Sequence, residues 1–324
     1  MPPNDLDSCW YLTGPTAGGK TAVGLELARL VGAEIVSLDS MALYRGLDIG
    51  TAKPTPDQRR RVPHHLIDLV EPEDEFSVAQ YCEAAAATVA EITARGRQPL
   101  FVGGTPLYLK SLLRGIFEGP PADWAWRTQI EEQAAANGPD WLHARLAEVD
   151  PRAAARLHPH DTRRLIRALE VYAKTGRPIS DWQQQFDRGR PAEECRVFVL
   201  DWPREQLYER INRRVETMFS DGLVLEVQEL LQSGRRFGRT ARQAVGYREV
   251  LEHLEGQRDL AATIELVQQR TRQFARRQLT WFRSLSECRR VPMTAGEHAV
   301  ETAEIARRIA EQAGGEQPAA GSIG

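Results

Sequence analysis

Short apolar runs alternate with longer amphipathic stretches over the first third of the chain. The apolar runs have the length of buried strands and occupy residues 9–13, 33–38, 65–69 and 99–102. The stretches between them repeat their apolar positions at helical spacing and occupy residues 21–30, residues 78–94 and a segment that ends at residue 113. Ser77 and Gln80 add a capping box before the second helix. This alternation predicts a doubly wound parallel sheet with helices on both faces.

The alternation stops at about residue 119. Residues 119–192 read as helices whose first turns are preceded by acidic capping residues, namely Asp123, Asp140, Asp150 and Asp161. A strand over residues 196–200 resumes the sheet, and helices are predicted over residues 204–219, 223–232, 242–254 and 260–284. We therefore expect a core of residues 1–118 and 193–312 that is interrupted by an inserted helical domain. The Gly-, Pro- and Ala-rich residues 313–324 are expected to be a disordered tail.

A phosphate-binding motif lies between the first predicted strand and the first predicted helix. Its eight residues fit the P-loop pattern G-x-x-x-x-G-K-[ST] and are Gly14, Pro15, Thr16, Ala17, Gly18, Gly19, Lys20 and Thr21. Such a loop turns backbone N–H groups toward phosphate oxygens, and the start of the helix adds partial positive charge. Lys20 is expected to reach the outer phosphate and Thr21 to offer its hydroxyl to Mg²⁺. The sequence thus predicts an α/β fold of the P-loop NTPase type that binds a di- or triphosphate.

The composition is that of a globular protein without a disulfide framework or a membrane span. The chain has 324 residues, 42% of them hydrophobic and 27% charged, which is ordinary for a globular protein. Its four cysteines are far apart, which argues against a structural zinc site or a disulfide framework and suits a reducing compartment. No signal peptide and no apolar run of membrane-spanning length are present in the sequence. We expect a cytoplasmic protein with no membrane partner.

The net charge of −3 alone argues weakly against a nucleic-acid partner, but the positive charges are clustered. Arginines cluster within residues 163–167, 235–242 and 270–283. Acidic residues gather in the segment 71–75, which we take to lie away from these clusters. Local basic faces of this kind are typical of proteins that bind a polyanion, whatever their total charge.

Three polar residues follow predicted strands, at the edge where open α/β sheets bind ligands. Asp39 could accept a proton, bind a ribose or cap the next turn. Thr105 could cap the following helix, contact a ligand, or do both. Asp201 follows four apolar residues as in a Walker B strand, but Trp202-Pro203 directly after it favours a residue that only ends a strand.

Further short motifs follow one another in a fixed order along nearly the whole chain. They are Asp39-Ser40-Met41, Tyr44-Arg45, residues 48–54, Gly103-Gly104-Thr105, residues 107–110, His158-Pro159, Asp161, residues 167–171, Gly222-Leu223, residues 243–247, Thr271-Arg272-Gln273 and Trp281-Phe282-Arg283. Together with the P-loop, this order resembles the tRNA dimethylallyltransferase (bacterial tRNA isopentenyltransferase) family. Gly18, Ala42 and Pro106 depart from the usual residues of that family.

The resemblance implies a reaction and roles for several residues. The family transfers a dimethylallyl group from dimethylallyl diphosphate to N6 of adenosine-37, next to the tRNA anticodon. The P-loop would then hold the leaving diphosphate with Mg²⁺, and Arg214 would be a second diphosphate clamp. Asp39 would be the general base and Thr105 would bond near the reacting nitrogen or the diphosphate.

The resemblance also implies a set of tRNA contacts. A monomer would extrude adenosine-37 from its stack and grip the anticodon stem-loop mainly through phosphates. The implied contact residues are Asp39, Ser40, Met41, Ala42, Thr105, Arg127, Arg163, Arg164, Leu165, Ile166, Arg167, Arg242, Gln243, Gly246, Tyr247, Arg248, Arg276, Arg277, Gln278 and Arg283.

Three other functions compete with this one. A P-loop kinase would turn over ATP and would need no RNA. A prenyltransferase acting on free adenylate would not need the basic helical insertion. A non-catalytic RNA-binding protein would leave Lys20, Asp39 and Thr105 without a task.

Overall fold

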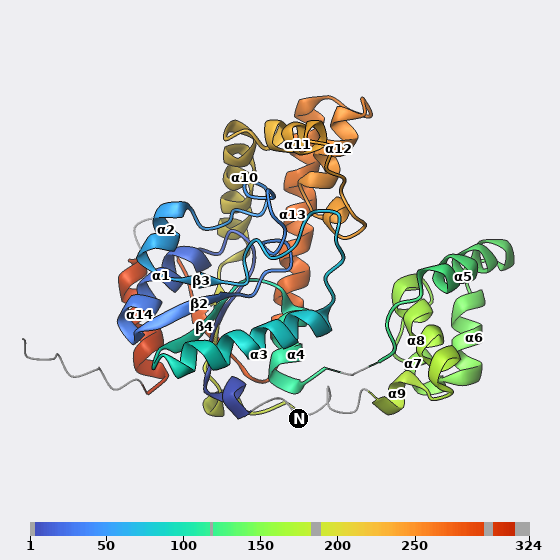
Figure 1. The fold of residues 1–324 in the computed structure, drawn as a ribbon, viewed down its shortest axis with the longest axis horizontal. Helices are drawn as coiled ribbons and strands as arrows, with labels where there is room; N and C mark the ends of the chain where they lie inside the picture. The colour runs from blue at the N-terminus through green and yellow to red at the C-terminus, as the bar shows by residue number, and fades with distance from the viewer. Residues whose placement is uncertain (1–3, 117–118, 183–188, 295–300, 315–324) are drawn as a thin grey trace, which may run out of the picture. The chain divides into compact units, whose positions relative to one another are not determined.

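A six-stranded parallel sheet forms the centre of the computed structural model, which describes residues 4–116, 119–182, 189–294 and 301–314 (Figure 1). The strands have the order β3-β2-β4-β1-β5-β6, and all of their pairings are parallel. Their bounds are β1 (Trp10–Thr13), β2 (Ala33–Ser37), β3 (His64–His65), β4 (Gln98–Val102), β5 (Val197–Asp201) and β6 (Cys288–Pro292). The predicted doubly wound parallel sheet is confirmed, whereas β6 was not predicted.

Helices cover both faces of this sheet, as the alternation of apolar runs predicted (Figure 1). Successive residues of a strand point to opposite faces, so Trp10 and Leu12 enter one core while Tyr11 enters the other. The first core includes α1 (Lys20–Val31) and α14 (Thr302–Gln312), and the second includes α3 (Val78–Ala94) and α4 (Pro106–Arg114). The predicted capping box opens α3, because Ser77 accepts from the backbone of Gln80 and Gln80 reaches back. Helix α14 was not predicted.

The strand predicted over residues 65–69 is mostly irregular. Only His64 and His65 pair with β2. Leu66 and Asp68 both have a φ of 57°, a left-handed conformation that a strand does not allow. The chain therefore leaves the sheet after two residues, and a short helix that was not predicted, α2 (Pro56–Arg61), precedes it.

Four further helices belong to the same compact unit. They are α10 (Arg204–Ser220), α11 (Leu223–Gln232), α12 (Tyr247–Leu254) and α13 (Leu260–Arg283). In Figure 1, α11 and α12 lie at the top, and α10 and α13 run from there down to the sheet. The helix predicted over residues 242–254 is divided, because a 3-10 turn, η4 (Ala241–Gln243), precedes Gly246 at a φ of 98°. The cluster that packs α11 and α12 together also contains Tyr44 and Leu47 from the segment after β2.

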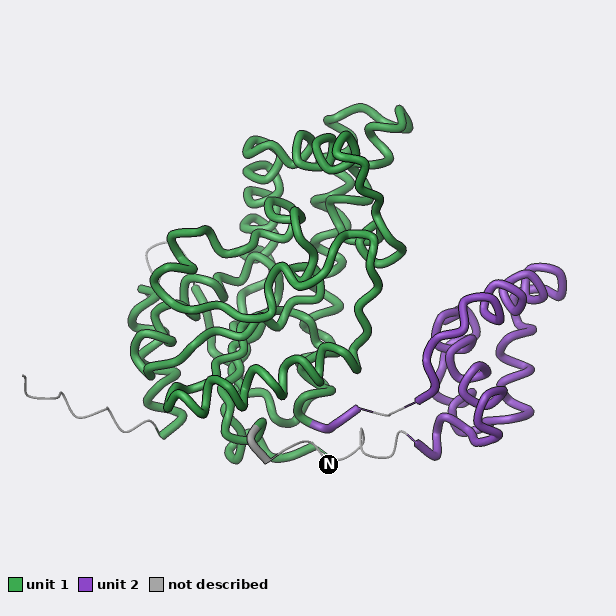
Figure 2. Tube along the Cα trace, in the orientation of Figure 1, with its two compact units in different colours: residues 1–113, 189–324 green, residues 114–188 purple. Residues whose placement is uncertain are grey.

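The chain divides into two compact units (Figure 2). Unit 1 contains residues 1–113 and 189–324, and unit 2 contains residues 114–188. Unit 2 is helical and comprises α5 (Trp124–Asn137), α6 (Trp141–Val149), α7 (Pro151–Ala154), α8 (Thr162–Thr175) and α9 (Ile179–Trp182). Asp123, Asp150 and Asp161 cap helices there as predicted, whereas Asp140 precedes α6 without a capping hydrogen bond from its side chain.

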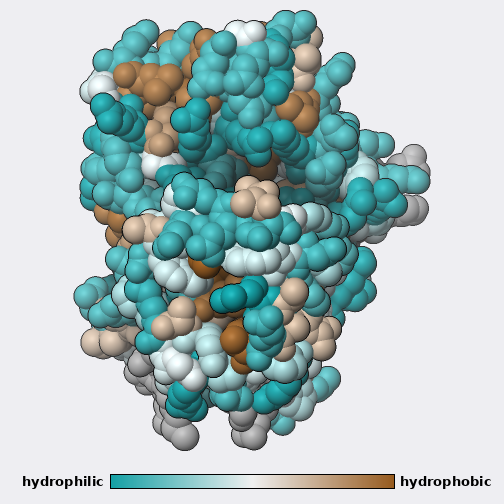
Figure 3. Space-filling view, turned by 90° about the vertical axis from the view of Figure 1, so that its right-hand side faces the viewer, coloured by the Kyte–Doolittle hydropathy of each residue, from teal (hydrophilic) through white to brown (hydrophobic). Residues whose placement is uncertain are grey.

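The surface drawn in Figure 3 is mostly hydrophilic, and its hydrophobic residues form small separate clusters. Within the described residues, no helix is both long enough and apolar enough to cross a membrane. Of the predicted tail, residues 315–324 lie outside the described part of the chain, and Ala313 and Gly314 directly follow α14.

Candidate active site

The P-loop joins β1 to α1 through several left-handed backbone conformations. Gly14 has a φ of 144°, and a Cβ at this residue would lie 2.9 Å from the carbonyl oxygen of Leu200. Ala17 and Gly19 have φ values of 59° and 88°, so the loop turns repeatedly through left-handed conformations. The N–H groups of the first turn of α1 have no helical acceptor. The loop and the helix start together can bind a phosphate group.

Two side chains beyond the motif fix the carbonyl groups of this loop. Trp202 Nε1 donates to Gly18 O at 2.9 Å, and Arg210 Nε donates to Ala17 O at 2.9 Å. The Arg210 guanidinium lies over the Trp202 ring at 4.2 Å from its centre. Sequence reasoning missed both residues; the only available signal was that Trp202 directly follows the fifth strand.

Lys20 lies inside the P-loop rather than extended from it. Its Nζ donates to Gly14 O at 3.0 Å and to Pro15 O at 2.8 Å. Burial and the charge of Arg214 lower the pKa of Lys20 to about 7, and the charge of Asp39 acts in the opposite direction. Burial thus disfavours the charged form of the free side chain, and an anion bound in the loop would favour it.

Arg214 reaches the same place from α10. Burial lowers the pKa of this guanidinium, while the charge of Asp39 raises it. The charge of Asp39 raises the pKa of both Lys20 and Arg214, so the three side chains lie near one another. They come from separate segments: Lys20 from α1, Arg214 from α10 and Asp39 from the loop after β2.

Asp39 caps the turn that follows it, as one of its predicted alternatives required. Its Oδ1 accepts from the N–H of Met41 at 2.9 Å. No other hydrogen bond of this carboxylate occurs within the described residues, so Oδ2 has no such partner there. Because the two oxygens are separate acceptors, capping by one leaves the other available for a proton. The capping role and the base role are compatible.

Thr105 ties the loop after β4 to the loop after β2. Its Oγ1 accepts from the N–H of Ser40 at 3.0 Å, and its own N–H donates to Leu38 O at 3.1 Å. A Cβ at Gly103 would collide with the backbone of Leu38, so the close approach of these loops requires glycine there. Thr105 thus fixes the segment next to Asp39.

Gln278 lies in this site and not on an exposed face, and its predicted contact with tRNA remains a prediction. Its side chain comes from α13, and only 3% of the residue is exposed. Its Oε1 accepts from the N–H of Thr16 at 2.9 Å, and its Nε2 donates to Gly104 O at 2.6 Å. Both ends of the amide therefore connect α13 to the P-loop and to the turn after β4.

Several other predicted tRNA contacts are buried. Leu165 and Ile166 are 0% and 3% exposed because they form the apolar face of α8 in the core of unit 2. Ala42 and Tyr247 are 5% and 0% exposed in unit 1. Gly246 opens α12, where its N–H donates to Glu249 Oε2 at 2.6 Å. Their neighbours cover these five residues in this conformation. Their contacts with tRNA remain predictions.

Two of the predicted phosphate-binding arginines are paired inside unit 2. Arg127 forms two hydrogen bonds with Glu170, at 2.9 and 2.7 Å, and Arg167 bonds the same carboxylate at 2.5 Å. Glu170 is 0% exposed and also accepts from the N–H of Asp123. A buried carboxylate needs such partners, so these arginines stabilise unit 2. Their contacts with tRNA remain predictions.

The acidic segment lies against the second arginine cluster, contrary to the expected separation. Arg235 pairs with Glu71, and the N–H of Arg236 donates to Glu73 Oε1 at 2.9 Å. Thr240 donates to Glu75 Oε2 at 2.6 Å. The local basic face predicted around residues 235–242 is therefore partly neutralised by residues of its own chain.

The remaining predicted tRNA contacts with long polar side chains are exposed. They are Arg163, Arg164, Arg242, Gln243, Arg248, Arg276, Arg277 and Arg283. Some of them also pair with acidic residues, as Arg242 does with Glu255 at 3.1 Å. Exposed ion pairs of this kind are weak and exchange readily for a phosphate.

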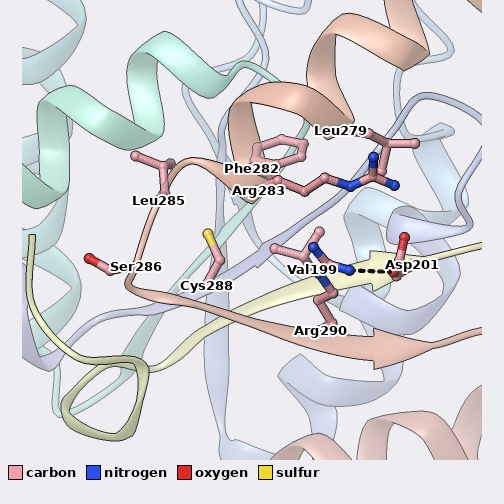
Figure 4. A pocket seen from close by; sticks show the side chains of 9 residues that line it. All are labelled: Val199, Asp201, Leu279, Phe282, Arg283, Leu285, Ser286, Cys288 and Arg290. Atoms are coloured by element: carbon pink, nitrogen blue, oxygen red, sulfur yellow. Dashed lines mark ion pairs between the residues drawn. The ribbon is translucent and has the colours of Figure 1, made fainter.

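A cavity of about 190 Å³ lies between β5, β6 and the end of α13 (Figure 4). Asp201 lines it and pairs with Arg290 at 3.7 Å. Arg283 lines the same cavity, and Ser286 and Cys288 lie at its other end (Figure 4). Asp201 thus ends its strand in an ion pair, in agreement with the favoured interpretation of that residue.

Comparison with known proteins gives a consistent set of similarities. The family model described as "IPP transferase" matches residues 42–285. A tRNA dimethylallyltransferase from Rhodopirellula baltica is 51% identical over 88% of this chain and 87% of its own. One from Geobacter metallireducens is 47% identical over 85% of this chain and 89% of its own.

Solved structures agree with these sequence matches. The tRNA isopentenylpyrophosphate transferase from Bacillus halodurans has a TM-score of 0.68 and 38% identity, and the match covers 95% of this chain and 97% of that one. A eukaryotic dimethylallyltransferase, solved in crystallographic snapshots of its action on tRNA, has a TM-score of 0.72 and 27% identity over 88% of this chain and 73% of its own. The predicted fold class agrees with both.

Proposed function

The chain belongs to the IPP transferase family of tRNA dimethylallyltransferases, and we propose that two loops at the carboxyl edge of its sheet divide the reaction between them. The enzyme transfers a dimethylallyl group from dimethylallyl diphosphate to N6 of adenosine-37 in tRNA. We assign the diphosphate to the P-loop and the attacking amino group to Asp39. The observation that carries this assignment is the convergence of Lys20, Arg214 and Asp39 from three segments of the chain.

The P-loop side stabilises the leaving group. As the allylic C–O bond breaks, its electron pair moves to the diphosphate oxygen, and negative charge grows there. The N–H groups at the start of α1 would face this charge, and Lys20 and Arg214 would add positive charge beside it once Lys20 exchanges its bonds to Gly14 O and Pro15 O for the diphosphate. Trp202 and Arg210 support this role because they hold the carbonyl groups of the loop in place.

The Asp39 side accepts the proton. The lone pair of N6 forms the new C–N bond, and the amino group then loses a proton to the free oxygen of Asp39. The amino group of adenine is a weak nucleophile, so proton removal during attack contributes about 10²–10⁴-fold to the rate. Thr105 supports this step because it fixes the backbone of Ser40 next to the carboxylate.

Mg²⁺ fits this site as a companion of the diphosphate. Among the described residues, no three His, Cys, Asp or Glu side chains are grouped to hold a metal ion. Thr21 at the start of α1 is the protein ligand that we assign, with diphosphate oxygens and water as the other ligands. When bound, Mg²⁺ would neutralise part of the charge on the leaving group.

The exposed arginines are assigned to the tRNA backbone. Arg163 and Arg164 of unit 2 and Arg276 and Arg277 of α13 present guanidinium groups at the surface, as phosphate binding requires. We propose that a monomer binds the anticodon stem-loop in the cytoplasm, where tRNA is modified, and that adenosine-37 leaves its stack to reach Asp39.

One assay tests this function against its main rival. The chain is incubated with labelled dimethylallyl diphosphate and unmodified tRNA, and digestion of the tRNA then locates the label. We expect label on adenosine-37 and no turnover of ATP. Hydrolysis of ATP or phosphate transfer from it, without prenyl transfer, would instead support a P-loop kinase.

A further inference from the structure

The turn at residues 48–50 is held from outside by two helices. Glu226 of α11 accepts from two consecutive backbone N–H groups through Oε2, at 3.0 Å from Asp48 and 2.7 Å from Ile49. The hydroxyl of Tyr247 at the start of α12 accepts from the next N–H, that of Gly50, at 3.1 Å. Three neighbouring N–H groups of an irregular segment are thus satisfied by two side chains.

The two side chains are also bonded to each other. Tyr247 donates its hydroxyl proton to Glu226 Oε1 at 2.6 Å. Burial and the charge of Glu226 raise the pKa of Tyr247 far above its usual range, so the hydroxyl remains a donor. The carboxylate and the phenol form one unit, which we call the Glu226–Tyr247 clamp.

The clamp and the turn fit closely. A Cβ on Gly50 would lie 2.5 Å from the ring of Tyr247, so only glycine permits this approach. Tyr247 packs in one buried cluster with Tyr44 and Leu47, which precede the turn. A change at Tyr247 therefore acts on the segment that begins at Asp39.

Lys53 joins the turn to the residues nearer Asp39. Its Nζ donates to Asp48 Oδ1 at 2.7 Å and to Tyr44 O at 2.5 Å, and its side chain is 2% exposed. No helix or strand has been assigned to residues 38–55 of the described chain. The path of this backbone therefore depends on partners outside it.

We propose that Glu226 and Tyr247 are positioning residues, which set the place of the Asp39 carboxylate through the turn at residues 48–50. The inference rests on the proposed function, in which Asp39 accepts the proton. Tyr247 was expected to contact tRNA, and its burial and bonds give it this different task. Thr105 fixes the start of the segment and the clamp fixes its far part.

Removal of the Tyr247 hydroxyl is the first test. We expect Tyr247→Phe to lower kcat for prenyl transfer by about 10–100-fold, because small misplacements of a catalytic group have effects of this size. The KM values for tRNA and for dimethylallyl diphosphate should change by less than about threefold, since neither is bound by the clamp. Tyr44→Phe is the matched control, because Tyr44 is buried in the same cluster and its hydroxyl bonds neither Glu226 nor the turn at residues 48–50. An unchanged kcat in Tyr247→Phe overturns the proposal.

Rescue at Glu226 is the second test. Glu226→Gln keeps an oxygen that can accept from the turn, so its kcat should stay within about fivefold of wild type. Glu226→Ala removes the acceptor and should lose about as much as Tyr247→Phe or more. Glu229→Ala, one turn along α11 at an exposed residue, is the control and should be unaffected. Equal losses in the Gln and Ala variants would contradict the clamp.

A double substitution separates positioning from general damage. If Tyr247 acts through Asp39, then Tyr247→Phe should cost less than about threefold in the Asp39→Asn background. If the kcat loss of the double variant equals the product of the two single losses, Tyr247 acts independently of Asp39. If Tyr247→Phe raises the KM for tRNA at unchanged kcat, Tyr247 contacts the RNA directly. Either result overturns the proposal. A wild-type chain without prenyl transfer, or a fully active Asp39→Asn variant, would instead refute the proposed function itself.

Discussion

The P-loop and the segment from residue 38 to residue 55 both lie at the carboxyl edge of the sheet, but they are stabilised in different ways. The P-loop is short, and it is anchored directly by the strand before it and the helix after it. The Asp39 segment is long and irregular, and side chains from α11 and α12 hold its N–H groups. Both loops bond side chains from distant parts of the chain, since Trp202, Arg210 and Gln278 bond the P-loop. The P-loop spans only residues 14–19 between β1 and α1, whereas the second segment spans residues 38–55 and has more backbone whose path depends on such partners. We expect the second to be the more sensitive to distant substitutions.

Loss of the Asp39 base should have the largest effect. Asp39→Asn keeps the size of the side chain and the oxygen that accepts from Met41, but it removes the basic oxygen. We expect kcat to fall by about 10²–10⁴, or about 3–5 kcal/mol of barrier. Binding of tRNA and of diphosphate should stay within a few-fold, because both are held mainly by other residues. Single-turnover prenyl transfer measures the rate.

The same substitution distinguishes the two tasks of Asp39. Asn is a good capping residue, so a carboxylate that only caps its turn would be replaced without loss. A folded Asp39→Asn protein with a near-normal single-turnover rate would therefore end the base assignment. It would also remove the functional difference between the two loops.

The contrast between the loops explains which parts of the site the sequence could predict. The P-loop was found by its pattern because its glycines, its lysine and its helix are neighbours in the chain. Asp39 was found by its place after a strand. Glu226 gave no signal, because the turn that it holds is 177 residues away. Tyr247 lay in a recognised motif, but the sequence could not show that the side chain points inward.

Removal of the Lys53 charge should destabilise the segment at residues 38–55 without affecting the P-loop. Lys53→Met keeps the buried stem but loses the bonds to Tyr44 O, Asp48 and Asp68, at a cost of about 1–3 kcal/mol. We expect faster hydrogen exchange at residues 48–50 and unchanged exchange in α1. Lys174→Met, which removes a partly exposed pair with Asp123 in unit 2, is the control and should cost about 0–1 kcal/mol. Equal acceleration in α1 would mean that the two loops are not supported independently.

The fold could be predicted where periodicity is strong and local. Helix α3 and the parallel arrangement of the sheet follow from apolar spacing, the alternation of strands and helices, and capping residues. Strand β6 was missed because its sequence, Cys-Arg-Arg-Val-Pro, lacks a continuous apolar run. The sequence could not show that Glu170 is buried between Arg127 of α5 and Arg167 of α8, because these residues come from helices that are far apart in the chain.

The pH dependence of diphosphate binding should test the P-loop side. The pKa of Lys20 is lowered to about 7 in the free site, so binding of an anion takes up a proton. Affinity should rise as pH falls, by about tenfold between pH 8 and pH 6, because the charged fraction of Lys20 rises by that factor. Calorimetry with inorganic diphosphate at fixed Mg²⁺ measures this. Lys20→Arg stays charged throughout and corrects for titration of the ligand itself. Parallel pH profiles in the two proteins would contradict the lowered pKa.

An exposed arginine outside both loops should give the smallest effect. Arg276 lies on the exposed face of α13, where a phosphate contact would be weak and screened by salt. We expect Arg276→Ala to raise the KM for tRNA a few-fold, to reduce the slope of log affinity against log salt by about 1, and to leave kcat unchanged. Affinity for inorganic diphosphate should not move, because the P-loop binds it without Arg276. Arg307→Ala, at an exposed residue of α14, is the control and should change none of these values. A fall in kcat with Arg276→Ala would mean that this face of α13 acts on the Asp39 segment or on the P-loop, and that the division of tasks between the two loops is incomplete.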